Sequence, residues 1–164
     1  MSEKYFDKQY KLFINGEWTD GTGNDRIEGY NPANGEKIYE IVDGTNKDVD
    51  AAIEAAQEAF KTFSRTGVKE RAELLHKMAD LIEENADHLA MVETLDNGKP
   101  IRETTGADIP LAADHYRYFA SVIRSEEDTV KMLDDDTMSI ILREPIGVVG
   151  QIIPWNFPFL MAAR

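Results

Sequence analysis

The sequence has 164 residues, 42% of them hydrophobic, a formal net charge of −13 and no cysteine. Its length corresponds to a single globular domain of ordinary composition. Without a thiol, the chain carries no disulfide, no cysteine-ligated metal and no cysteine nucleophile. The excess of 31 acidic over 18 basic residues argues against nucleic-acid or anionic-membrane partners, because binding to both depends on Lys and Arg.

The two ends of the sequence differ in character. Met1–Tyr10 mixes charged and aromatic residues without an apolar run, so no secretory signal is predicted and a cytoplasmic location is expected. Ile146–Ala163 carries no charge, and its length just reaches that of a membrane span. Glycines and two prolines interrupt this run, so we prefer a buried strand, Ile146–Ile153, followed by a turn and a helix from Pro158. Because that helix stops at Arg164, the sequence is interpreted as ending inside a domain.

The first forty residues are predicted to form strands and turns. Asn15-Gly16 lies between two β-rich runs, Lys11–Ile14 and Glu17–Thr19, which is typical of a type I′ hairpin turn. A second turn at Asn31–Gly35 leads into a predicted strand, Lys37–Val42.

Three helical stretches are predicted next. The first begins at a Thr45/Asp48 capping box and places five apolar residues on one face, namely Val49, Ile53, Ala56, Phe60 and Phe63. The second begins near Val68, with Asn85 as a candidate interruption, and stops at Asn97-Gly98. The third covers Thr104–Arg124, where Pro110 either kinks the helix or marks its first turn.

The acidic stretch Ser125–Asp136 is predicted to be a loop. Asp134–Asp136 lacks the alternating carboxylates and central glycine of a calcium loop, so we interpret it as a solvated turn. The alternation in Met138–Arg143 predicts a strand with one buried face. The three histidines, at positions 76, 88 and 115, lack zinc-site spacing and are interpreted as solvent-facing or structural.

Asn156 is the candidate functional residue. It follows the predicted strand Ile146–Ile153, and open α/β sheets bind ligands beyond the carboxyl ends of their strands. The alternative is that Asn156 caps the helix that follows. The spacing leaves both interpretations open. Gly147–Gly150 does not match GxGxxG and fails as a dinucleotide fingerprint.

Four segments, in order, resemble sequence blocks of the aldehyde dehydrogenase superfamily: Phe13–Trp18, Asn31–Gly35, Glu93–Pro100 and Glu144–Pro158. The resemblance implies the N-terminal part of a longer NAD(P)-dependent enzyme. The implied fold is a three-layer α/β fold with leading hairpin strands and long helices. Residues 1–164 would be an incomplete NAD(P)-binding domain whose strands join the oligomerisation region, without the catalytic domain. The full-length form is expected to be a homo-oligomer.

The resemblance also implies a mechanism and site residues. In the family, a cysteine thiolate adds to the aldehyde, the oxyanion collapses by hydride transfer to NAD or NADP, and a glutamate-activated water hydrolyses the thioester. Asn156 matches the residue that donates to the oxyanion. The cofactor cleft is matched by Ile152, Ile153, Pro154, Trp155 and Asn156. Phe157 and Met161 match the aldehyde tunnel, and the Tyr30 backbone with Asp96 matches a monovalent-cation site.

In this superfamily the cysteine, the general base and the phosphate-binding helix lie in segments that would follow Arg164. We therefore expect the chain alone to be inactive. Neither the aldehyde nor the choice between NAD and NADP follows from these residues. Two alternatives remain: a stand-alone interaction or oligomerisation module derived from that fold, and a membrane-associated helical protein, which rests only on the terminal apolar run.

Overall fold

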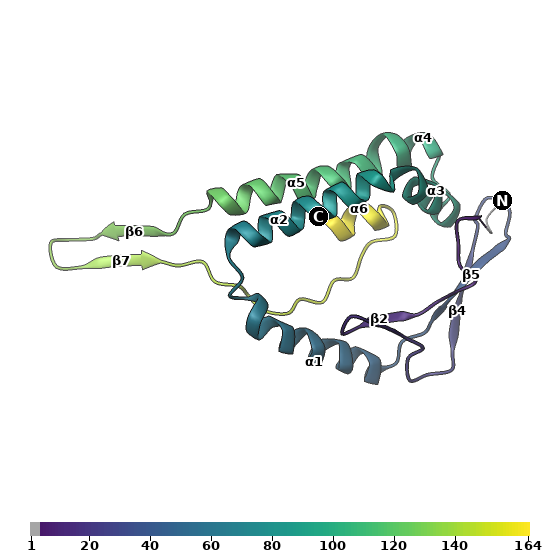
Figure 1. Ribbon diagram of the computed structural model, residues 1–164, viewed down its shortest axis with the longest axis horizontal. Helices are drawn as coiled ribbons and strands as arrows, with labels where there is room; N and C mark the ends of the chain where they lie inside the picture. Colours follow the sequence, from purple (N-terminus) through teal and green to yellow (C-terminus); the bar gives the residue numbers. More distant parts are fainter. Residues whose placement is uncertain (1–3) are drawn as a thin grey trace.

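The computed structural model describes residues 4–164, and its first part is built of short strands (Figure 1). The strands form a three-stranded sheet in the order β1-β5-β4, with β1 parallel and β4 antiparallel to β5, and a separate β2-β3 hairpin. Their bounds are β1 Gln9–Tyr10, β2 Leu12–Ile14, β3 Glu17–Thr19, β4 Arg26–Tyr30 and β5 Lys37–Val42. The predicted hairpin is confirmed, and Asn15 and Gly16 both have positive φ, as a type I′ turn requires.

Helix α1 (Asn46–Phe63) begins as its sequence predicts. The Asp48 carboxylate accepts hydrogen bonds from the backbone N–H and the hydroxyl of Thr45, both at 2.8 Å. The same carboxylate accepts a 2.9 Å hydrogen bond from the Thr22 N–H, so the cap also ties the β3-β4 connection to the helix. The apolar face of α1 stays largely exposed, since Val49 and Phe63 are each 53% accessible.

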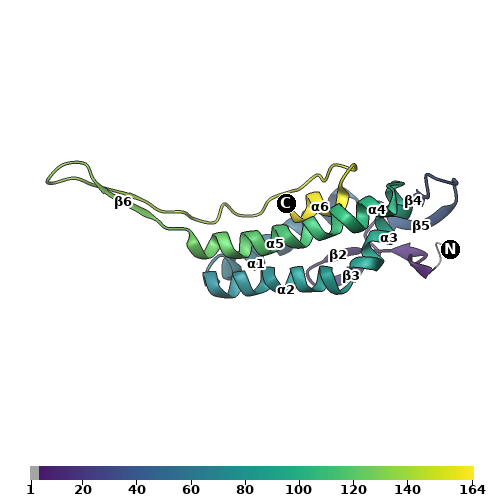
Figure 2. The same ribbon diagram turned by 90° about the horizontal axis from the view of Figure 1, so that it is seen from above.

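The remaining helices form one layer in which α2 and α5 lie side by side (Figures 1 and 2). Asn85 separates α2 from α3, and α3 ends at Gly98 in the left-handed conformation, both as predicted. Pro110 lies in the first turn of α5, directly after a π-helical turn, η2. The bounds are α2 Val68–Glu84, α3 Ala86–Asn97, α4 Ile101–Glu103, η2 Thr104–Asp108, α5 Ile109–Ser125 and α6 Pro158–Ala163.

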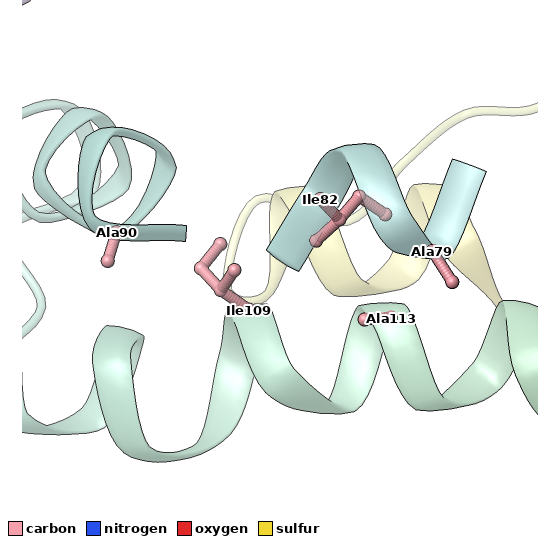
Figure 3. Packing of buried hydrophobic residues seen from close by; sticks show 5 residues of the cluster. All are labelled: Ala79, Ile82, Ala90, Ile109 and Ala113. Carbon is pink, nitrogen blue, oxygen red and sulfur yellow. The ribbon is translucent and has the colours of Figure 1, made fainter. Parts of the chain in front are cut away.

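The hydrophobic core lies between these helices. Small side chains let α2, α3 and α5 approach closely around Ile82 and Ile109, as Figure 3 shows. The cluster consists of Ala79, Ile82, Ala90, Ile109 and Ala113, and Phe159 of α6 packs against it. Helix α6 is therefore fastened to the core although it is only six residues long.

A second hairpin, β6 (Thr129–Met132) with β7 (Met138–Ile141), projects beyond the end of α5 in both views (Figures 1 and 2). The prediction that all of Ser125–Asp136 is a loop was therefore wrong for Thr129–Met132, since β6 pairs with β7. The prediction of one buried face on Met138–Arg143 was also wrong, because side chains on both faces of the strand are exposed: Ile140 is 54% and Ile141 is 58% accessible. The Asp134 carboxylate accepts a hydrogen bond from the Asp136 N–H, which confirms the turn between the strands.

The predicted buried strand Ile146–Ile153 is wrong in this structure. Residues 142–157 form a long irregular connection from the hairpin to α6, and Ile146 and Ile152 are almost fully exposed (Figure 1). A strand needs a neighbour to receive its backbone hydrogen bonds, and none of the sheets in residues 4–164 extends to this segment. Within that range, no helix is long and apolar enough to cross a membrane.

The accessible surface is unusually large for the size of the chain. It measures 12136 Å², whereas a compact monomer of 18.5 kDa exposes about 8,200 Å². The excess comes from the projecting arm, the irregular connection and the uncovered face of α1. These surfaces are largely apolar, as expected of surfaces that pack against other polypeptide.

Candidate active site

The turn before α6 carries the candidate residue Asn156. Helix α6 has Phe157 at its N-cap position and no side-chain cap hydrogen bond, so the structure does not support the alternative interpretation of Asn156 as a helix cap. The Asn156 side chain is exposed, and no hydrogen bond to it is found among residues 4–164. Its amide is therefore available to donate to a ligand.

Helix α3 holds this turn from both sides of Asn156. The Asn97 side-chain amide donates a 2.6 Å hydrogen bond to the Trp155 carbonyl. The Lys99 ammonium lies 3.6 Å from the centroid of the Phe157 ring, within the range of a cation–π interaction. The two contacts join residues far apart in sequence, and Asn156 lies between the residues that they fix.

The Lys99 ammonium is itself anchored in the interior. It forms an ion pair with Asp108, whose side chain is almost completely buried at the end of the π-helical turn. The Lys99 side chain is also mostly shielded from solvent. An ion pair shielded in this way is weakened little by salt.

Glu93 lies beside this ion pair and is only 5% exposed. Neither of its carboxylate oxygens accepts a hydrogen bond from an N–H or hydroxyl group of the described residues. Burial raises the pKa of Glu93 to about 7, helped by a hydrogen bond between the Glu93 and Asp108 carboxyl groups and by the charge of Asp108, because all three favour the protonated form of Glu93. A buried carboxyl that titrates near neutrality thus lies behind the Asn156 turn.

The residues predicted to line the cofactor cleft form an open strip before the turn. Ile152 is fully exposed and Trp155 is 83% exposed, whereas Ile153 is partly buried. Pro154, which lies between Ile153 and Trp155, has no backbone N–H to donate. The strip offers an apolar surface suited to a planar ring, but it contains no charged side chain that could bind a phosphate.

The structure partly organises the residues predicted for the aldehyde tunnel. The Met161 N–H donates a 2.9 Å hydrogen bond to the Phe157 carbonyl, so the two residues lie one helical turn apart, as their spacing predicts. The Phe157 ring faces the Lys99 ammonium, and Met161 is partly buried. Their role toward an aldehyde stays a prediction.

Tyr30 and Asp96 use their side chains elsewhere. The Tyr30 hydroxyl donates to Glu28, and the Asp96 carboxylate accepts a hydrogen bond from the Tyr39 hydroxyl. This hydrogen bond and burial raise the pKa of Tyr39, with burial the larger cause. No group of three or more acidic or histidine side chains able to hold a metal is found within residues 4–164. The predicted cation site involves the backbone carbonyl of Tyr30, whereas these contacts involve its hydroxyl group, so the cation site stays a prediction.

Sequence reasoning missed Asn97, Lys99 and Asp108 as parts of the site. The first two lie in the Glu93–Pro100 block, which was interpreted as a helix stop and as a segment that resembles the family, with no role for Asn97 or Lys99 themselves. No local pattern marks their contacts, because the partners follow almost sixty residues later. A lysine and an asparagine flanking a left-handed glycine at a helix end are otherwise typical of an exposed C-terminal cap.

An exposed amide on a helix-anchored turn in an α/β scaffold is the kind of site that the aldehyde dehydrogenase resemblance implies. The model of the aldehyde dehydrogenase family matches residues 18–164, and the chain belongs to this family. Two bacterial relatives cover almost the whole chain. Acetaldehyde dehydrogenase 2 of Cupriavidus necator is 47% identical over 96% of the chain, and aldehyde dehydrogenase B of Escherichia coli is 46% identical over 94%.

Solved structures confirm the α/β fold class. An NAD+ complex of aldehyde dehydrogenase from Bacillus cereus superposes with a TM-score of 0.93 at 39% identity, covering 98% of this chain. The chain spans about a third of that structure and 31% of the C. necator relative. The described elements are thus those of the N-terminal portion of the fold.

Proposed function

We propose that the chain is the N-terminal part of an NAD(P)-dependent aldehyde dehydrogenase that oxidises aldehydes to carboxylic acids. The observation that carries this proposal is the free side-chain amide of Asn156, held on a turn fixed by Asn97 and Lys99. Residues 1–164 then form an incomplete NAD(P)-binding domain without the catalytic domain. The family match, and the chain's coverage of only 31% of the C. necator relative, support this assignment.

The chemistry assigned to Asn156 is stabilisation of an oxyanion. When a thiolate adds to an aldehyde, a carbon–sulfur bond forms and the carbonyl π-electrons move to oxygen. A side-chain N–H aimed at this oxygen stabilises charge that is absent in the ground state, and losing such a donor costs about 3 kcal/mol. The thiolate must come from outside these 164 residues, which contain no cysteine.

The cofactor proposed is NAD or NADP, which accepts a hydride from the former aldehyde carbon. Ile152 and Trp155 would supply an apolar wall for its ring, which agrees with their exposure. Groups for the phosphates would have to come from other segments. The residues that select NAD or NADP would also lie in those other segments.

A grafting experiment tests the function of Asn156. This chain would replace the corresponding N-terminal segment of E. coli aldehyde dehydrogenase B, to which it is 46% identical. We expect the chimera to reduce NAD(P) with an aldehyde, and Asn156→Ala to lower kcat by about 100- to 1000-fold. Asn24→Ala, at another exposed asparagine, is the control. A folded, active chimera that is unaffected by Asn156→Ala would refute the role.

The chain alone is proposed to be inactive. The purified 164-residue chain with aldehyde and NAD or NADP should produce no reduced nicotinamide. Measurable turnover that co-purifies with the chain and disappears in Asn156→Ala would contradict this part of the proposal. A cytoplasmic location and the absence of nucleic-acid or membrane partners stay predictions.

A second candidate function is an interaction or oligomerisation module, which the exposed β6-β7 arm favours. Val130 and Ile140 are cross-strand neighbours and are 60% and 54% exposed. If this face mediates association, V130E together with I140E should abolish concentration-dependent self-association in sedimentation, whereas K131E on the neighbouring register position should preserve it. A monomeric wild-type chain at all concentrations would count against this module.

A further inference from the structure

The residues on either side of Asn156 are both held by the C-terminal end of α3. Asn97 donates to the carbonyl of Trp155, the residue before Asn156, and Lys99 lies on the ring of Phe157, the residue after it. Asn97 and Trp155 are separated by the same number of residues as Lys99 and Phe157. Asn156 is the residue between the two contacts, and its own side chain takes part in neither.

The geometry of the α3 end explains how two nearby residues reach both sides of the turn. Gly98 between them has a φ of +82°, which ends the helix and redirects the chain. A Cβ at Gly98 would lie 2.7 Å from the Cγ atom of Pro32, so the space beside it is already filled. Pro100 follows and leads directly into α4. The position of Lys99 is therefore set by backbone geometry as well as by its side-chain contacts.

The anchor of Lys99 is unusually well defined. Asp108 is 1% exposed and lies at the end of the π-helical turn η2. Such turns occur frequently at functional sites. The Thr94 and Thr104 hydroxyls form a 2.9 Å hydrogen bond between α3 and the same turn. Helix α3 and η2 thus form a fixed base beneath Lys99.

We propose that Asn97 and Lys99 are positioning residues that fix the orientation of the Asn156 amide, with Asp108 as the anchor of Lys99. This inference rests on the proposed function of Asn156 as an oxyanion donor. Such a donor is effective only when its supporting residues hold it within about 0.5 Å of the productive geometry. Exposed turns do not reach this precision without contacts to a rigid element.

The first test is nuclear magnetic resonance of the 164-residue chain, which requires no turnover. Asn97→Asp keeps the size of the side chain but replaces the donor with an acceptor. Lys99→Met keeps most of the aliphatic stem without the charge, and Lys99→Arg is the rescue variant, because a guanidinium can pair with Asp108 and lie on a ring. Asn24→Asp and Lys69→Met repeat the first two changes at exposed positions.

The expected result is a local loss of order. Backbone order parameters at residues 155–157 should fall from about 0.85 to below about 0.6 in Asn97→Asp and Lys99→Met, but not in Lys99→Arg or the two controls. Unchanged order parameters in folded Asn97→Asp and Lys99→Met would overturn the proposal. If Lys99→Met does not fold because Asp108 is left unpaired, Lys99→Met with Asp108→Asn removes that charge and gives the same test.

The second test separates this inference from the proposed function. In the chimera with E. coli aldehyde dehydrogenase B, Asn97→Asp and Lys99→Met should lower kcat by about 100-fold with little change in KM, and Lys99→Arg should restore it. An Asn156→Ala variant without effect refutes the proposed function. If Asn156→Ala lowers kcat as expected but Asn97→Asp and Lys99→Met leave kcat unchanged, only the positioning role is refuted.

Discussion

Glu93 offers a prediction whose sign and size follow from its surroundings. Its carboxyl group is buried beside the Asp108 carboxyl group and has its pKa raised to about 7, chiefly by burial. At neutral pH and above, the folded chain must therefore hold an ionised group in an unfavourable place. Glu93→Gln keeps the shape of the side chain and removes the charge.

The magnitude comes from the pKa difference between the two states. The ordinary value is 4.5 and the folded value is about 7, and each pKa unit corresponds to about 1.4 kcal/mol. The folded state binds the proton more tightly, so the free energy of unfolding falls as pH rises from about 4.5 to 7 and is then constant. We expect Glu93→Gln to add up to about 3 kcal/mol above pH 7 and almost nothing below pH 4.5.

Urea unfolding followed by circular dichroism at about pH 5 and about pH 8 measures this difference. The control is Glu84→Gln, the same change on an exposed residue of α2, which should have almost no effect at either pH. The reasoning is refuted if Glu93→Gln shows no gain at pH 8 relative to pH 5. A gain of the same size in Glu84→Gln would also refute it, since the effect would then be one of net charge.

Three further stability predictions use the same unfolding assay. Ile109→Ala in the core should cost about 3 kcal/mol, whereas Leu111→Ala at a 41% exposed position should cost less than about 1; equal losses would contradict the assigned core. Gly16→Ala should cost about 1–2 kcal/mol, because position 16 has a positive φ but room for a Cβ. Gly98→Ala should cost more, because position 98 has a positive φ and a Cβ there would meet Pro32; the reverse order would refute the Pro32 contact. Thr45→Ala should cost about 1 kcal/mol by removing a cap, and no change would show that the Asp48 contact adds nothing.

Local elements were predicted well because their causes lie within a few residues. The Thr45/Asp48 cap, the Asn15-Gly16 turn and the Gly98 helix end depend on short-range hydrogen bonds and on allowed φ angles. Pro110 was left open between a kink and a first turn, and the structure places it in the first turn of α5.

Predictions of burial failed where burial depends on distant partners. The apolar run Ile146–Ile153 has the composition of a buried parallel strand, yet it is exposed because none of the described strands pairs with it. The alternation at Met138–Arg143 correctly predicted a strand but not its environment. An apolar pattern indicates which side chains of a segment favour burial. Whether they are buried depends on another segment packing against them.

The sequence by itself determined the order and type of most elements, the family, and Asn156 as the candidate donor. Only the tertiary structure decided that Asn156 does not cap α6 and that Asn97 and Lys99 hold the residues on either side of it. It also revealed Glu93 as a buried carboxyl beside the Lys99–Asp108 ion pair. The physical reason is range: caps and turns are satisfied by near neighbours, whereas desolvation, ion pairing and positioning depend on which distant segments the packed helices bring together.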